Sequence, residues 1–173
     1  QAPGLDPSEG SASAAMSALM FFIGLPIVII GPFAGVLVDR INKKWVMAIA
    51  PAIRAFIIIF IAFIINEPSL RLIFYGMVFL ISVESQFFIP AKSALIPEIT
   101  DEKDLLDANS LSATAGVIVQ ILTYAVAGAV IAETGYANSL LATAVIYFAV
   151  ALCALFIKSA HKRHGLEKRL TDV

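Results

Sequence analysis

The sequence predicts an all-α membrane protein with about five transmembrane helices. Of its 173 residues, 60% are hydrophobic and 14% are charged, and the mean hydropathy is +0.90. Soluble domains carry about a quarter charged residues, so a chain of this composition could not cover its apolar surface in water. Lipid must therefore surround most of the chain.

Five apolar stretches are long enough to cross a bilayer. About 20 apolar residues are needed, because a helix rises about 1.5 Å per residue and the hydrocarbon layer is about 30 Å thick. Inside that layer each backbone N–H must find a partner within its own segment, so these stretches form helices. Barrel strands would alternate apolar and polar residues, and the run FIIIFIAFII does not. We expect helices at about residues 14–38, 45–65, 70–90, 111–132 and 140–157.

Positive charges gather on one side of the predicted membrane. Cytoplasmic loops retain Lys and Arg, and the side opposite the gathered charges holds Arg71 alone, while Arg54 lies within a segment. We therefore predict that residues 1–13 form an extracellular or periplasmic loop, and that residues 158–173 form a basic linker with a cytoplasmic carboxy terminus. The cytoplasmic set is Arg40, Lys43, Lys44, Lys92, Lys103, Lys158, Lys162, Arg163, Lys168 and Arg169.

The loop after the first segment carries a family pattern. Residues 35–44 read GVLVDRINKK, which resembles the loop signature of the major facilitator superfamily, where Gly-x-Leu-Ala-Asp-Arg precedes a turn residue and a basic pair. Val38 stands where a small residue is usual. Asn42 replaces the usual Gly, and because Asn tolerates the left-handed conformation we expect such a turn here. Residues 90–111 also resemble the stretch between helices four and five in the macrolide-efflux and siderophore-exporter branch.

The resemblance implies a partial major facilitator six-helix bundle, containing helices two to six of the amino-terminal half. The missing first helix and a carboxy-terminal six-helix half would then be its partners. It also implies that Asp39 and Arg40 form a latch on the cytoplasmic side, within a gating motif completed by Gly35, Lys43 and Lys44. The alternative is a solvated charge cluster that serves only to orient the protein.

Arg54 and Glu84 are the only formal charges well inside the apolar segments. A charge at the bilayer centre costs at least about 2.5 kcal/mol and usually faces a partner or a water-filled cavity. Arg54 lies about 15 Å from Lys44 and Glu84 about 12 Å from Lys92, on consecutive antiparallel helices. We hypothesise that they pair, and that protonation of Glu84 breaks the pair during proton-coupled exchange. The alternatives are a purely structural pair and an Arg54 that extends to the cytoplasmic surface.

The fourth segment contributes polar groups at Gln120, Thr123 and Tyr124. These could line a cavity, or they could simply bond across helices. Antiporters of the family often carry a Gly-Pro pattern here, and residues 116–128 contain no proline. Small residues let helix backbones approach closely, so we expect helix packing at Gly31, Gly35, Gly116 and Gly128.

The leading functional hypothesis is secondary active transport in the cell membrane. It would be proton-coupled efflux of a drug-like or amphipathic small molecule by alternating access between two helical halves. A net charge of −1 gives no basic face for a nucleic acid, and one cysteine, without nucleotide or catalytic motifs, leaves no expected metal, cofactor or enzyme activity. A membrane-embedded scaffold or accessory subunit, and the transmembrane core of a larger enzyme, are the alternatives.

Overall fold

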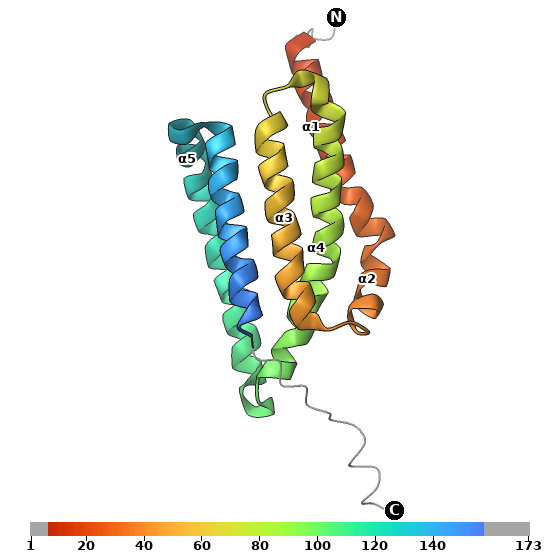
Figure 1. Ribbon diagram of the computed structural model, residues 1–173, viewed down its shortest axis with the longest axis vertical. Coiled ribbons are helices and arrows are strands. Elements are labelled where there is room, and N and C mark those ends of the chain that lie inside the picture. The colour runs from red at the N-terminus through yellow and green to blue at the C-terminus, as the bar shows by residue number, and fades with distance from the viewer. Residues whose placement is uncertain (1–6, 158–173) are drawn as a thin grey trace, which may run out of the picture.

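All regular structure in the computed structural model is helical over the residues it describes, 7–157. Side chains are described from residue 13 onward, and the predicted linker at 158–173 lies outside the described residues. The helices lie side by side along the long axis of the molecule (Figure 1). In order they are α1 (Pro7–Ile29), α2 (Gly31–Val38), α3 (Lys43–Ile64), a 3-10 turn (Pro68–Leu70), α4 (Arg71–Ile99), a second 3-10 turn (Glu102–Asp104) and α5 (Leu105–Leu155).

The first apolar segment is a bent pair of helices. α1 and α2 meet at Ile30 with an angle of 50° between them. Pro32, in the first turn of α2, causes the bend, because proline has no N–H and its ring clashes with the carbonyl four residues earlier. α1 begins at Pro7, so the predicted loop through residue 13 is wrong. Apolarity marks where a helix enters lipid, not where the helix itself starts.

The start of α3 is fixed by a side-chain cap. Oδ1 of Asn42 accepts the backbone N–H of Lys44 at 3.0 Å, which satisfies one of the donors that a helix start leaves free. The backbone of Asn42 is extended, with φ −71° and ψ 109°. The expected left-handed turn is therefore wrong, because Asn42 acts as a helix cap and not as a substitute for glycine.

α4 is longer than its apolar pattern predicts. The pattern ends near Pro90 and predicts a loop up to about residue 109, but the helix continues through Pro90 and Pro97 to Ile99. Each proline removes one N–H from the hydrogen-bond ladder, which membrane helices tolerate when neighbouring groups satisfy the freed carbonyls. The connection to α5 shrinks to residues 100–104. As at α1, the helix continues beyond its apolar part.

α5 consists of two helices joined at one residue. Gly135 has φ 78° and ψ 166°, and the chain is helical on both sides of it. Figure 1 shows the two resulting arms side by side, and we call residues 105–134 the first arm and residues 136–155 the second arm. The reversal lies within the predicted connection at 133–139, and it is shorter than predicted because a single glycine, in a conformation closed to other residues, reverses the chain.

Polar side chains hold this reversal together. The hydroxyls of Thr134 and Ser139 lie 2.9 Å apart, and the Asn138 amide donates to the carbonyl of Thr134 at 2.9 Å. The Ser139 hydroxyl also donates to the carbonyl of Gly135 at 2.7 Å. These bonds satisfy backbone carbonyls that the broken ladder leaves free, as a helix end requires.

The second arm packs on α3 through small and β-branched residues. Ala55, Ile58 and Ala144 form the buried cluster, and the rings of Phe56 and Phe148 meet edge to face beside it, with centroids 5.1 Å apart. Alanine at such contacts lets two helix backbones approach closely. The first arm lies outside this contact, and its apolar side chains are largely exposed.

The described helices have the dimensions of membrane spans. α3, the stretch from Pro68 to Ile99, and α5 are each long and apolar enough to cross a bilayer, and the bent α1–α2 pair raises the number to four. Because α5 contains two helices, counting its arms separately gives the five apolar segments of the sequence. Large apolar side chains are exposed on every long helix. The fold is therefore the all-α membrane bundle that the composition predicts.

Replacing Gly135 with alanine should destabilise the protein. Its φ and ψ lie in a region that is essentially closed to other residues and costs them about 1–3 kcal/mol. Gly116→Ala is the matched control, because no atom lies within 4 Å of a Cβ added there, and alanine is favoured in a helix by about 1 kcal/mol. Thermal unfolding of the full-length protein in detergent should give a lower Tm for Gly135→Ala alone. Equal Tm values for both variants would contradict the reversal at Gly135.

Candidate functional site

Two charged side chains meet between α3 and α4. Nε of Arg54 donates to Oε2 of Glu84 at 2.7 Å, and Nη2 of Arg54 donates to the same oxygen. The side chains of Arg54 and Glu84 are only 16% and 9% exposed. The structure thus brings together the two charges that the sequence places at similar depth, and each neutralises the other where water is scarce.

Ser85 and Tyr147 complete the shell around Arg54. Nη2 donates to the Ser85 hydroxyl at 2.5 Å, and that hydroxyl donates in turn to the carbonyl of Ile81 at 2.9 Å. Nη1 donates to the Tyr147 hydroxyl at 3.2 Å. These bonds use four of the five N–H groups of the guanidinium. The network therefore joins α3 to α4 and to the second arm of α5.

Tyr147 contributes through its ring as well as its hydroxyl. The ring centroid lies 5.2 Å from Cζ of Arg54, within the range of a cation–π contact. Nothing in the charge pattern predicts this role, because a tyrosine in an apolar segment has no formal charge. Its spacing from Ala144 becomes informative only once α5 is known to pack on α3, since residues three apart share a helix face and Ala144 belongs to the cluster packed on α3.

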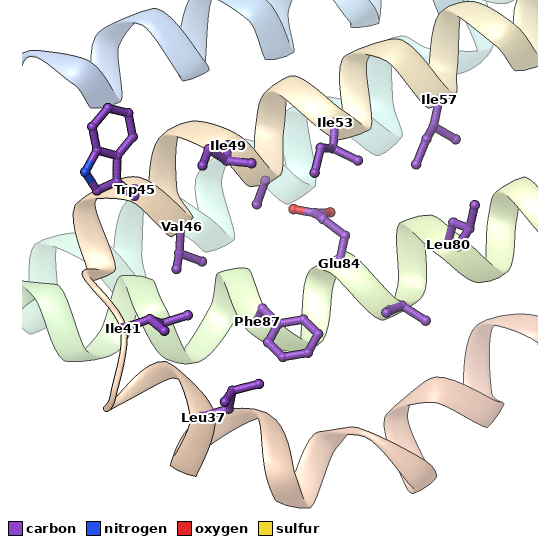
Figure 2. Close-up of a pocket in the computed structure, with 12 residues that line it drawn as sticks. Leu37, Ile41, Trp45, Val46, Ile49, Ile53, Ile57, Leu80, Glu84 and Phe87 are labelled. Atoms are coloured by element: carbon purple, nitrogen blue, oxygen red, sulfur yellow. The ribbon is translucent and has the colours of Figure 1, made fainter.

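An apolar groove lies beside the pair. It has a volume of about 550 Å³ between α3 and α4, and Leu37 of α2 and Ile41 of the α2–α3 loop also line it. Figure 2 shows the Glu84 carboxylate pointing into it among apolar side chains. Glu84 is the one charged residue in its lining, which consists of Leu37, Ile41, Trp45, Val46, Ile49, Ala50, Ile53, Ile57, Leu80, Val83, Glu84 and Phe87.

The loop motif is exposed at the end of α2. The backbone N–H of Asp39 donates to the carbonyl of Gly35 at 3.1 Å, and that of Arg40 to the carbonyl of Leu37 at 3.1 Å. Within residues 13–157 no side-chain hydrogen bond or ion pair reaches Asp39 or Arg40. Their latch role stays a prediction, which places the partner in another part of the protein.

Lys43 makes a contact that the family pattern does not suggest. Its Nζ lies 2.7 Å from Oε1 of Glu98, near the end of α4, and the side chains of Lys43 and Glu98 are 15% and 38% exposed. Lys44 has no such partner among the described residues, where only its backbone N–H is engaged. The sequence does carry a signal for this contact. α3 and α4 are consecutive antiparallel helices, so the start of α3 and the end of α4 lie at the same end of the pair. This ion pair fixes the loop motif against α4.

The polar residues of the first arm do not join the Arg54 network. The amide of Gln120 donates to the Tyr124 hydroxyl at 3.3 Å, and the Thr123 hydroxyl donates to the carbonyl of Val119 at 2.8 Å. All three side chains are exposed. Thr123 also lines a cavity of about 390 Å³ between the two arms. A cavity-lining role for Gln120 and Tyr124 stays a prediction.

Among the four glycines expected at helix contacts, Gly31 alone has a close neighbour in the described structure. A Cβ added at Gly31 would lie 3.3 Å from Oε1 of Gln86 on α4. At the other three no described atom lies within 4 Å of such a Cβ, and they are Gly35, Gly116 and Gly128. Gly31 thus permits the approach of α2 to α4, and the packing role of the others stays a prediction.

Fold and site together define a class of protein. Helices of bilayer length with exposed apolar surfaces, and an ion pair enclosed between them, are features of an integral, multi-pass membrane protein. Among the described residues no group of three His, Cys, Asp or Glu side chains could hold a metal ion.

The sequence matches the profile of the Major Facilitator Superfamily over residues 3–171, and the chain belongs to this family. This is a family of transporters and not of enzymes, in agreement with the absence of catalytic motifs from the sequence. The match covers nearly the whole chain, so family membership does not depend on the loop motif alone.

Three curated proteins are similar to this chain. It is 28% identical over 142 residues to "Uncharacterized MFS-type transporter YfiS" of Bacillus subtilis (strain 168), covering 82% of this chain and 33% of the relative. It is 31% identical over 137 residues to "Lysophospholipid transporter LplT" of Serratia proteamaculans (strain 568), covering 79% and 32%. The LplT of Photorhabdus laumondii is 31% identical over 153 residues, covering 86% and 36%.

The chain spans about a third of the length of these relatives. No solved structure matches it. The relatives support the superfamily, and they do not single out the macrolide-efflux branch that residues 90–111 resemble.

Breaking the Arg54–Glu84 pair from one side should destabilise the full-length protein more than removing both charges. Removal of one partner from a buried pair costs about 3–5 kcal/mol, because the remaining charge has no counter-charge. We expect Glu84→Gln to lower the Tm in detergent and the double variant Arg54→Gln/Glu84→Gln to recover most of the loss. Lys103→Gln is the control, because its Nζ lies 4.0 Å from Asp104 and both side chains are mostly exposed. Equal losses for the single and double variants would show that the pair is not coupled.

Proposed function

We propose that the chain is part of a secondary active transporter that moves an amphipathic small molecule by alternating access, driven by protons. Family membership supports transport, and the enclosed Arg54–Glu84 pair supports the use of a proton. The full transporter would also need the first helix and the carboxy-terminal half, whose surfaces complete a site between two halves. We propose a cytoplasmic carboxy terminus on the basis of the Lys and Arg distribution.

The single observation that carries the proton-coupling proposal is the position of the Glu84 carboxylate. It bonds Arg54 on one side and borders an open groove on the other. When Glu84 binds a proton it loses its negative charge, and its attraction to the guanidinium falls. Arg54 would keep its bonds to Ser85 and Tyr147, so the guanidinium would not be left without partners. Protonation therefore weakens the link between α3 and α4 to the bond with Ser85, and it leaves the guanidinium hydrogen-bonded but without a counter-charge.

The substrate class follows from the groove and the relatives together. Several relatives are named lysophospholipid transporters, and an apolar groove beside a charged pair suits a molecule with a tail and a polar head. We propose such an amphiphile as the substrate, and a drug-like molecule with the same two parts would satisfy the same chemistry. Export as the direction of transport rests on the resemblance of residues 90–111 to exporters.

We also propose that residues 35–44 close the cytoplasmic side. Asp39 and Arg40 are exposed at the end of α2 and free to meet a partner from another part of the protein. The ion pair of Lys43 with Glu98 would hold the loop at a fixed height against α4, so that a contact made by Asp39 is transmitted to the helix that carries Glu84.

The test is transport by the full-length protein in proteoliposomes with an imposed proton gradient. Macrolides, siderophores and lysophospholipids are the first substrates to compare. Glu84→Gln should abolish gradient-driven transport, because the side chain can no longer exchange a proton, while substrate exchange without a gradient persists. Glu67→Gln is the matched control, since Glu67 is exposed at the far end of α3. Unchanged gradient-driven transport by Glu84→Gln would exclude the coupling role.

A further inference from the structure

Arg54 occupies only one of the two oxygens of the Glu84 carboxylate. Both of its hydrogen bonds to Glu84 end on Oε2. In the part of the chain that the structure describes, no donor is bonded to Oε1. A carboxylate offers about four acceptor positions, so a second cation can bind without displacing Arg54.

The groove determines what can reach this free oxygen. Glu84 is only 9% exposed, and its carboxylate points into the groove (Figure 2). The wall contributed by α3 is a row of residues at helical spacing, Ile49, Ile53 and Ile57, that face the groove. A ligand that fits must therefore combine an apolar chain with one end that donates hydrogen bonds to a carboxylate.

We propose that this groove binds an amphiphile with an amine head group, whose ammonium bonds Oε1 of Glu84 while its chain lies along the isoleucines of α3. The proposal deepens the proposed function, on which it rests, by naming the chemistry of the substrate head and its place. An ammonium makes a charge-assisted hydrogen bond to a carboxylate, about twice as strong as a neutral one. An anionic head would meet the carboxylate with like charge, and a neutral alcohol would gain only the weaker bond.

The carboxylate makes a helix from the rest of the protein a poor occupant of this groove. A packed apolar helix would cover Oε1 and leave a charged acceptor without a donor, which is costly in a low dielectric. An amine ligand supplies the missing donor and leaves when Glu84 is protonated. Proton and ligand would then compete for one oxygen, as exchange of the two across a membrane requires.

The groove carries its own reporter, Trp45, the single tryptophan among these 173 residues. The experiment uses the full-length protein in nanodiscs with every other tryptophan replaced by phenylalanine. Bromoalkyl probes of equal chain length, ending in a primary amine, an alcohol or a sulfate, are titrated while Trp45 fluorescence is followed. We expect quenching by the amine at a concentration about tenfold lower than by the alcohol, and weakest quenching by the sulfate.

Two variants separate the head-group contact from the groove. Glu84→Gln should remove the preference for the amine while all three probes still bind. Val83→Phe should weaken quenching by every probe because it adds bulk to the groove lining and leaves both charges in place. Val117→Phe is the matched control, because Val117 is 56% exposed on the first arm and lines none of these cavities.

Equal quenching by amine and alcohol would overturn the proposal, and so would an amine preference that survives Glu84→Gln. No quenching of Trp45 by any probe would also overturn it, because the groove would then be filled by another part of the protein. If Glu84→Gln fails to fold, the reporter protein that retains Glu84 still tests the proposal. Absence of an amine preference in that protein would overturn it. These measurements need no proton gradient, so binding can fail while gradient-driven transport persists, and the two proposals can fail separately.

Discussion

In hydrocarbon a formal charge requires a counter-charge within reach, and the Arg54–Glu84 pair is where this protein meets that requirement. Because Arg54 also bonds Ser85 and Tyr147, satisfying one guanidinium sets the relative height of three helices. In a membrane, apolar packing alone does not fix the relative position of two helices, because lipid tails are as apolar as the side chains they would replace. The polar network therefore provides the register that hydrophobic contact cannot.

The surrounding packing allows this network to form. Ala55 follows Arg54 directly and is buried against Ala144, so the second arm of α5 comes close enough for Tyr147 to reach the guanidinium. At the far end, Gly135 reverses the chain in one residue and returns the second arm to α3. At the loop end, Lys43 and Glu98 join α3 to α4. α3 is thus held at its middle and at one end by ionic contacts.

The sequence predicts those parts of this architecture for which the lipid environment allows only one structure. Lipid solvent makes the apolar stretches helical, and the depth of Arg54 and Glu84 could be counted from the nearest loop lysines. Helix ends could not be predicted, because apolarity says where a helix leaves lipid and nothing about where its hydrogen bonds stop, as Pro7 and Ile99 show. Tyr147 was equally hidden, since its role depends on the packing of α5 against α3.

The central claim is that the guanidinium–carboxylate contact exists in a bilayer. Solid-state NMR of the full-length protein in lipid, with ¹⁵N in arginine side chains and ¹³C in glutamate carboxyls, measures it directly. We predict strong dipolar dephasing, consistent with the 2.7 Å separation of Arg54 Nε and Glu84 Oε2, that disappears in Arg54→Gln. Dephasing that is absent, or unchanged in Arg54→Gln, would contradict the claim.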